Sequence, residues 1–299
     1  MTNGVLKSLK RNLSHLHTDT DANFRRELLG YTQKLFDRLR GSMSSLARLK
    51  RKGDASNHEQ VIVSVSCFQS GKCVSLGSTG DPLRVPLNFI IWYIGFLKWE
   101  LRSTSSYQRR ITALRALIIV LKSGLDPRVS HHHLSRSAKG QIRWPYGLQI
   151  WDHRFIRELL DLVLDPFDDI RSASASILEL CLNSSSAQDK ALIMAILPQF
   201  ISRAENAMLR TGRADQADGL ARAYSLLFSQ SPRHPIGMQE PENSGPTAQM
   251  NIVLRIVDQL EETIEVAQND MSLAVEGRPV HGIFAALRYV TFFRVIYQF

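Results

Sequence analysis

The feature that most constrains the fold of this chain is the spacing of its apolar residues, which recur every three or four positions through most of its 299 residues. The segment 107–122 shows this pattern on two faces at once. One face carries Ile111, Leu114, Ile118 and Leu121, and the opposite face carries Ala113, Ala116 and Val120. A helix that is apolar on two faces must be covered on both, as in the inner layer of a stacked helical array.

Further helices are predicted on both sides of this segment. Asp21 is placed to cap a long helix that reaches Leu49, with an expected break at Gly41–Ser42. Pro86 suits the first turn of the next helix, whose apolar face extends to Leu101. Five more helical stripes follow, at 170–180, 187–209 with a kink or break at Pro198, 217–228, 252–264 and 283–290.

One stretch alternates as a β-strand would, at Val61, Val63, Val65 and Cys67. A single isolated run does not make a sheet, so this stretch is interpreted as helical or poorly ordered. The predicted fold class is therefore all-α.

The segment 164–171, Leu-Asp-Pro-Phe-Asp-Asp-Ile-Arg, refines that prediction. A proline after one helix, an acidic N-cap and an apolar–arginine step into the next helix are typical of the turn inside HEAT-like repeats. Helix pairs of about 40 residues with degenerate sequence fit the same architecture. We expect a HEAT/armadillo-like α-solenoid of stacked antiparallel helix pairs, and an irregular helical bundle is the competing fold.

The predicted organisation follows from composition along the chain. A basic helical segment at 1–68 and a loop at 69–84 precede helical repeats at 85–229, which contain a loop at 123–143. A linker at 230–247 leads to a C-terminal helical pair at 248–299. The last residues are apolar and uncapped, which predicts that the repeat array is truncated there.

The net charge of +9 is unevenly distributed. Residues 1–52 and 81–160 each carry +8, whereas residues 161–299 carry −6. A basic front and an acidic back indicate a polyanionic partner for the first part of the chain, although basic helices also serve simply to solvate a surface.

The same composition argues for a cytoplasmic protein with no membrane partner. Three cysteines are too few for a disulfide framework, which favours a reducing compartment. The longest apolar run, Val85 to Leu97, has the length of a buried helix rather than a membrane span.

The motifs of enzymes and metal sites are not found in the sequence. Gly71-Lys72-Cys73 and residues 77–80 lack the spacing of a phosphate-binding loop, and there is no glycine-rich turn for a cofactor. Adjacent histidines at 131–133 rarely converge on one ion, and the cysteines lack zinc spacing. We therefore expect no enzyme, no catalytic, cofactor-binding or metal-binding residues, no cofactor and no small-molecule substrate.

Arginine and lysine are the remaining candidates for function, because guanidinium groups pair well with phosphates. The candidate contacts with RNA or a partner are Arg25, Arg26, Lys50, Arg51, Lys52, Arg102, Arg109, Arg110 and Arg115. Salt bridges between helices are the competing interpretation for Arg109, Arg115 and Arg171. Trp144, Tyr146 and Trp151 either stack on bases or anchor the basic loop to the array.

Several segments, in an order that fits, resemble the THADA-type proteins, which are large helical-repeat regulators of tRNA ribose methylation. They are Asn12-Leu-Ser-His-Leu-His-Thr-Asp-Thr-Asp-Ala-Asn-Phe-Arg25, Ser105-Ser-Tyr-Gln-Arg-Arg-Ile-Thr-Ala-Leu-Arg115, Trp144-Pro-Tyr-Gly-Leu-Gln-Ile-Trp151, Asp165-Pro-Phe-Asp-Asp-Ile-Arg171, Gly212-Arg-Ala-Asp-Gln-Ala-Asp-Gly-Leu-Ala-Arg222 and Val280-His-Gly-Ile-Phe-Ala-Ala-Leu-Arg-Tyr289.

The resemblance implies a non-catalytic scaffold that binds an FtsJ-like tRNA 2′-O-methyltransferase and supports methylation of a tRNA anticodon-loop ribose, at position 32. Family members are several times longer, so this chain resembles an internal stretch upstream of their most distinctive conserved domain. A HEAT-type protein–protein adaptor without RNA binding stays open as the alternative function, and an enzyme ranks behind both.

Overall fold

The computed structural model describes residues 3–53, 62–64, 84–125, 129–139, 147–184, 186–211 and 214–228, together with Asp258, Glu261 and Glu265. The chain divides into two compact units. The first unit comprises residues 1–158 and 176–192, and the second comprises residues 159–175 and 193–299.

The described elements are helical except for two strands of three residues each, in agreement with the predicted helical class. In chain order they are α1 (Asn3–Leu16), α2 (Ala22–Gly53), β1 (Ile62–Ser64), α3 (Arg84–Glu100), α4 (Tyr107–Lys122), the 3₁₀ turn η1 (His131–His133), α5 (Arg136–Lys139), β2 (Gly147–Gln149), α6 (His153–Val163), α7 (Asp168–Leu182), α8 (Ala187–Thr211) and α9 (Ala214–Phe228).

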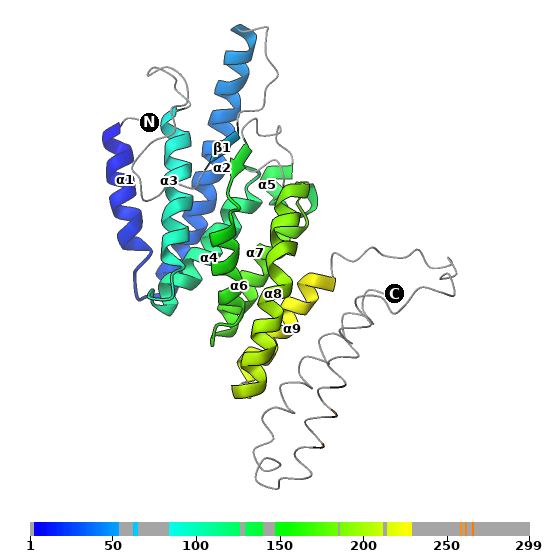
Figure 1. Cartoon of the computed structure of the whole chain (residues 1–299). Coiled ribbons are helices and arrows are strands. Elements are labelled where there is room, and N and C mark those ends of the chain that lie inside the picture. Colours follow the sequence, from blue (N-terminus) through cyan, green and yellow to red (C-terminus); the bar gives the residue numbers. More distant parts are fainter. Residues whose placement is uncertain are drawn as a thin grey trace, which may run out of the picture. The chain divides into compact units, whose positions relative to one another are not determined.

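Helices α1 to α4 form the helical core of the first unit. Helix α3 packs against both α1 and α4, and α2 packs against α4 (Figure 1). The predicted apolar face of α3 is buried, and both predicted faces of α4 are buried apart from half-buried Ile118. Aromatic rings fill the centre: Tyr93 and Phe89 of α3 stack with centroids 5.9 Å apart, and Phe36 of α2 lies 5.3 Å from Tyr93. These contacts give α3 its long buried face.

Helix α2 begins as predicted and continues where a break was expected. The Asp21 side chain accepts a hydrogen bond from the Asn23 backbone N–H at 2.9 Å, which caps the helix. The expected break at Gly41–Ser42 is wrong, because α2 runs unbroken to Gly53. A glycine within a helix costs only about 1 kcal/mol. The buried side chains of Arg40 and Met43 on either side of Gly41 offset that cost.

The alternating run at 61–67 was expected not to form a sheet, and part of it does. Strand β1 pairs in parallel with β2, with Ile62 opposite Gly147 and Ser64 opposite Gln149. The partner lies more than 80 residues further along the chain, so local alternation gave no sign of it.

The predicted loop at 123–143 is partly ordered into short helices, η1 and α5. Two residues after the end of α4, Gly124 has a φ of +78°, in the left-handed region that a glycine adopts without strain. The side chain of Asp152 then caps α6 by accepting the Phe155 N–H at 2.9 Å.

The second unit contains the end of α6, the start of α7, most of α8, and α9. Helix α8 is continuous across Pro198, so the break that was expected there as the alternative to a kink does not occur. Ile170 of α7, Ile193 of α8 and Tyr224 of α9 are fully buried. The predicted linker at 230–247 lies outside the described residues, as does the C-terminal pair at 248–299 apart from three helical residues.

Candidate nucleic-acid interface

The helices of the first unit alternate in direction, so two of their turns lie at one end. The α1–α2 turn (residues 17–21) and the α3–α4 turn (residues 101–106) both lie there (Figure 1). A hydrogen bond of 2.9 Å between Nε2 of His17 and the hydroxyl of Tyr93 joins the first turn to α3. We call this the turn end of the first unit.

The turn end brings together five of the nine candidate contacts and separates them from three others. The five are Arg25, Arg26, Arg102, Arg109 and Arg110. Lys50, Arg51 and Lys52 are helical, but their side chains lie outside the described part of the chain. Because α2 is continuous and rises 1.5 Å per residue, they are about 36 Å along the helix from Arg26.

Arg109 is engaged in a salt bridge, as the competing interpretation predicted. Its Nε lies 2.5 Å and its Nη2 lies 2.7 Å from the two carboxylate oxygens of Glu100. Glu100 is buried at the end of α3, so this bidentate pair joins α3 to α4 across the turn. The hydrogen bonds that Arg109 donates to Glu100 raise the pKa of Arg109 above its ordinary value.

The other candidates at the turn end range from half-buried to exposed. Arg26 is exposed, and Arg102 and Arg110 are half-buried. Arg25 donates from Nη1 to the backbone oxygen of Asp19 at 2.5 Å, which fixes the α1–α2 turn. Arg115 is exposed two turns into α4.

Arg40 counts among the basic residues of α2, but the structure places it inside the protein. It is 1% exposed, and its guanidinium donates to the backbone oxygens of Ser123 and Ser137. Asp37 completes the site with an ion pair of 3.3 Å. Burial lowers the pKa of Arg40, and the carboxylate of Asp37 opposes that shift. Arg40 therefore anchors the end of α4 and the start of α5 to α2.

The signal for this role was present in the sequence. Arg40 follows Leu28, Thr32 and Phe36 at steps of four and precedes Met43 by three, and all of these residues are buried. A single arginine on an apolar helical stripe predicts a buried clamp rather than a surface charge.

Lys98 is a second internal cation. Its Nζ lies 2.9 Å from Oδ2 of Asp152 and 4.4 Å from the ring centre of Phe155, and it also donates to the backbone oxygen of Ile150. Burial lowers the pKa of Lys98, and the charge of Asp152 opposes the shift. Trp151 is buried and stacks on Phe155, so it anchors this segment, while Trp144 and Tyr146 lie outside the described residues.

Comparison with known proteins identifies the family of this chain. A family model described as "Trm732, TPR repeats" matches residues 1–172, which is more than half of the chain. The chain belongs to the Trm732 family.

The match extends beyond that region. The chain is 25% identical over 290 residues to the tRNA (32-2′-O)-methyltransferase regulator trm732 of Schizosaccharomyces pombe. The alignment covers 94% of this chain and 16% of that relative. No solved structure matches the chain. The resemblance to the THADA-type regulators is thus confirmed at the level of the family.

Two of the segments that carried the resemblance of this Trm732-family chain meet in its second unit. Arg171 donates from Nε to Asp218 of α9 at 2.9 Å and from Nη1 to the backbone oxygens of Asp165 and Pro166. Arg222 donates to Asp218 at 3.0 Å and also reaches Asp168 at 3.0 Å. The salt-bridge interpretation of Arg171 is therefore confirmed.

Gly219 brings α9 close to α6 beside this network. A Cβ atom at Gly219 would lie 2.2 Å from the backbone oxygen of Val163. The close packing of α9 on α6 therefore requires a glycine at position 219, which the sequence alone does not reveal.

The residues of the Trm732-family chain that the structure describes contain no group of three or more His, Cys, Asp or Glu placed to hold a metal ion. Cys181 is buried, and Cys67 and Cys73 lie outside the description. Among the same residues, no helix combines the length and apolarity needed to cross a membrane.

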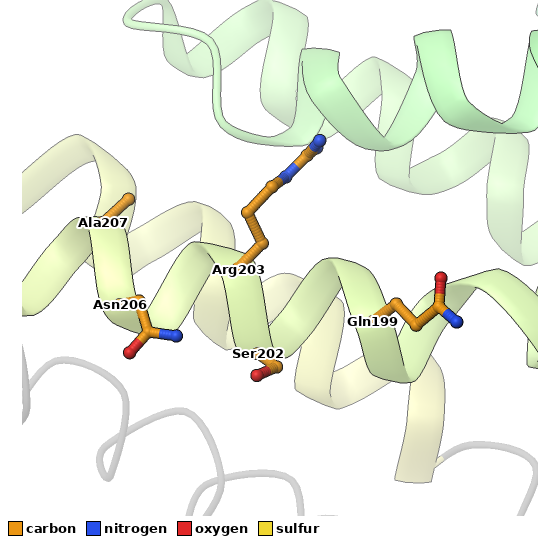
Figure 2. A pocket seen from close by; sticks show the side chains of 5 residues that line it. All are labelled: Gln199, Ser202, Arg203, Asn206 and Ala207. Atoms are coloured by element: carbon orange, nitrogen blue, oxygen red, sulfur yellow. The ribbon is translucent and has the colours of Figure 1, made fainter.

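A shallow hollow runs along α8 in the second unit. Figure 2 shows its lining, which comes from that helix alone: Gln199, Ser202, Arg203, Asn206 and Ala207. Arg203 pairs with Asp161 at 2.6 Å, and both side chains are largely exposed. The residues of this lining do not include a nucleophile paired with a general base.

Proposed function

We propose that this chain is part of a non-catalytic regulator of tRNA 2′-O-ribose methylation, acting at position 32 of the anticodon loop through an FtsJ-like methyltransferase in the cytoplasm. The observation that carries the proposal is the alignment along 94% of the chain with a protein named as the regulator of that methyltransferase. The chain spans about a sixth of that relative. In this proposal it therefore supplies one surface for contact with the methyltransferase and tRNA, and not the whole regulator.

The first unit supplies the tRNA contact. Arg25, Arg26, Arg102 and Arg110 gather at the turn end, and phosphate groups attract such clusters over several ångströms. Arg109 contributes less because its charge is neutralised by buried Glu100. Lys50, Arg51 and Lys52 form a second tRNA contact at the opposite end of α2. Exposed Arg115 on α4 adds to one of these two contacts, the turn end or the end of α2.

Stacked helix pairs of the HEAT/armadillo type are the scaffold in this proposal. The antiparallel packing of α1 to α4 and the turn between α6 and α7 support it. In that turn Arg171 donates to two backbone oxygens and to Asp168, so the arginine of the predicted motif closes the turn. The family model describes the region as TPR repeats, which are also helix pairs.

The proposal is tested with purified methyltransferase, tRNA and the full chain. We expect the chain to co-purify with the methyltransferase and tRNA, and to compete with the complete regulator for them, lowering methylation at position 32 in a reconstituted reaction. A chain that binds the methyltransferase but never tRNA would support the protein-only adaptor instead. A chain that binds neither would contradict both functions.

A further inference from the structure

The turn end of the first unit carries an aromatic side chain that is open to solvent. Trp99, in the last turn of α3, is 38% exposed. Arg102 lies on it, with Cζ 3.1 Å from the centre of the ring. At that distance the guanidinium plane must lie face to face with the indole, because an edge-on group would drive its hydrogens into the ring.

The α3–α4 turn that carries this pair is rich in hydrogen-bond donors, and no acidic residue lies between Arg102 and Arg110. The first turn of α4 contains no acidic residue, and Arg109 neutralises Glu100. Ser103, Thr104 and Ser106 are exposed in the turn, and Arg110 follows it. Unpaired RNA bases stack on aromatic rings and on guanidinium planes, while cations and hydroxyls hold the adjoining backbone.

A second exposed aromatic residue makes a poorer platform. Tyr31 of α2 is 65% exposed, but its cation is Lys34, whose Nζ lies 5.3 Å from the ring centre. An ammonium group is a point charge and offers no plane for stacking. Exposed Glu27 also lies one turn earlier on the same face, where it repels phosphate.

We infer that the α3–α4 turn is a stacking site for an unpaired nucleotide of tRNA. Trp99 and Arg102 form the platform, and Arg110 with the hydroxyls of the turn holds the neighbouring phosphate. This inference rests on the proposed function and names the place where the first unit meets an RNA loop.

The experiment measures binding of the full 299-residue chain to two RNA probes, an anticodon stem-loop of tRNA and the same stem as a blunt duplex. Trp99→Leu removes the ring but keeps apolar bulk, and Arg102→Lys keeps the charge but removes the plane. Tyr31→Leu is the matched control. We expect Trp99→Leu to weaken stem-loop binding by about 5- to 100-fold and to leave duplex binding unchanged. We expect Arg102→Lys to act in the same direction and Tyr31→Leu to have less than about a twofold effect.

The salt dependence separates stacking from charge. Neither Trp99→Leu nor Arg102→Lys changes the number of cations, so the slope of log affinity against log salt should stay that of the wild type. Circular dichroism checks the fold, and Arg102→Lys in the turn decides the question if Trp99→Leu is misfolded.

Wild-type stem-loop affinity in both variants would overturn the inference and leave the proposed function standing, because the chain would still bind tRNA. Loss of methyltransferase binding with intact RNA binding would also overturn it, since the turn would then be a protein-docking surface. A wild-type chain that binds no RNA would overturn the inference and the proposed tRNA contact together.

Discussion

His17 makes the stability of the first unit depend on pH. The imidazole is fully buried between α1 and α3, with its ring centre 5.7 Å from that of Tyr93 and 5.4 Å from that of Phe96. Its Nδ1 has no hydrogen-bond partner among the described residues. Burial lowers the pKa of His17 from 6.5 to about 4, so the folded protein holds the ring neutral.

The direction of the effect follows from this shift. Between pH 6.5 and 4 the unfolded chain binds a proton that the folded chain excludes, so the free energy of unfolding rises with pH. The stability that depends on the neutral His17 ring is fully present above pH 6.5 and is lost as the pH falls toward 4. With these two pKa values, lowering the pH from about 7.5 to 5.0 removes about 2 kcal/mol.

The assay is urea unfolding of the full chain and of His17→Gln at several pH values. Glutamine retains a polar group near the Tyr93 hydroxyl and does not titrate. The stability difference between the two proteins should shrink, or reverse in favour of the variant, by about 2 kcal/mol over that interval. Parallel pH profiles would refute the reasoning, because they would mean that His17 titrates alike in both states.

Three further contacts are tested by substitution and chemical denaturation. Gly219→Ala should destabilise by about 2 kcal/mol despite the better helix propensity of alanine, because its Cβ meets a backbone oxygen, whereas Gly30→Ala, which meets nothing within 4 Å, should stabilise by up to about 1 kcal/mol. Equal effects of the two glycine variants would contradict that contact. Arg109→Met should cost about 2–3 kcal/mol by leaving buried Glu100 without its cation, and a second change, Glu100→Leu, should recover most of the loss. Arg40→Met should cost about 3 kcal/mol or more through the freed carbonyls, and a loss below about 1 kcal/mol would argue against the clamp.

Helices α3 and α4 of the first unit were predictable because their stability depends on local periodicity. The apolar stripe of α3 and the two faces of α4 are buried as the spacing requires. The continuity of α2 was not predictable from Gly41, since it depends on the burial of Arg40 against Ser123 and Ser137 far along the chain. Pairing of β1 with β2 is equally non-local.

The candidate site was predictable in composition but not in arrangement. Sequence identified the basic residues, but it could not show that Glu100 neutralises Arg109 or that Arg102 lies on Trp99, because both contacts depend on the geometry of the α3–α4 turn. Nor could it separate Arg26 from Lys50, because that distance depends on α2 remaining unbroken.

The central claim, that the first unit contacts tRNA through its basic residues, is tested most directly by the salt dependence of tRNA binding. The measurement is the Kd of the full chain for tRNA between about 50 and 300 mM KCl. If Arg25, Arg26, Arg102 and Arg110 each meet a phosphate, together they contribute about −3 to the slope of log affinity against log salt, and the second contact at Lys50, Arg51 and Lys52 makes the slope steeper. Replacing Arg26 by glutamine should reduce the slope by about one. A slope near zero, or no binding at low salt, would contradict the claim.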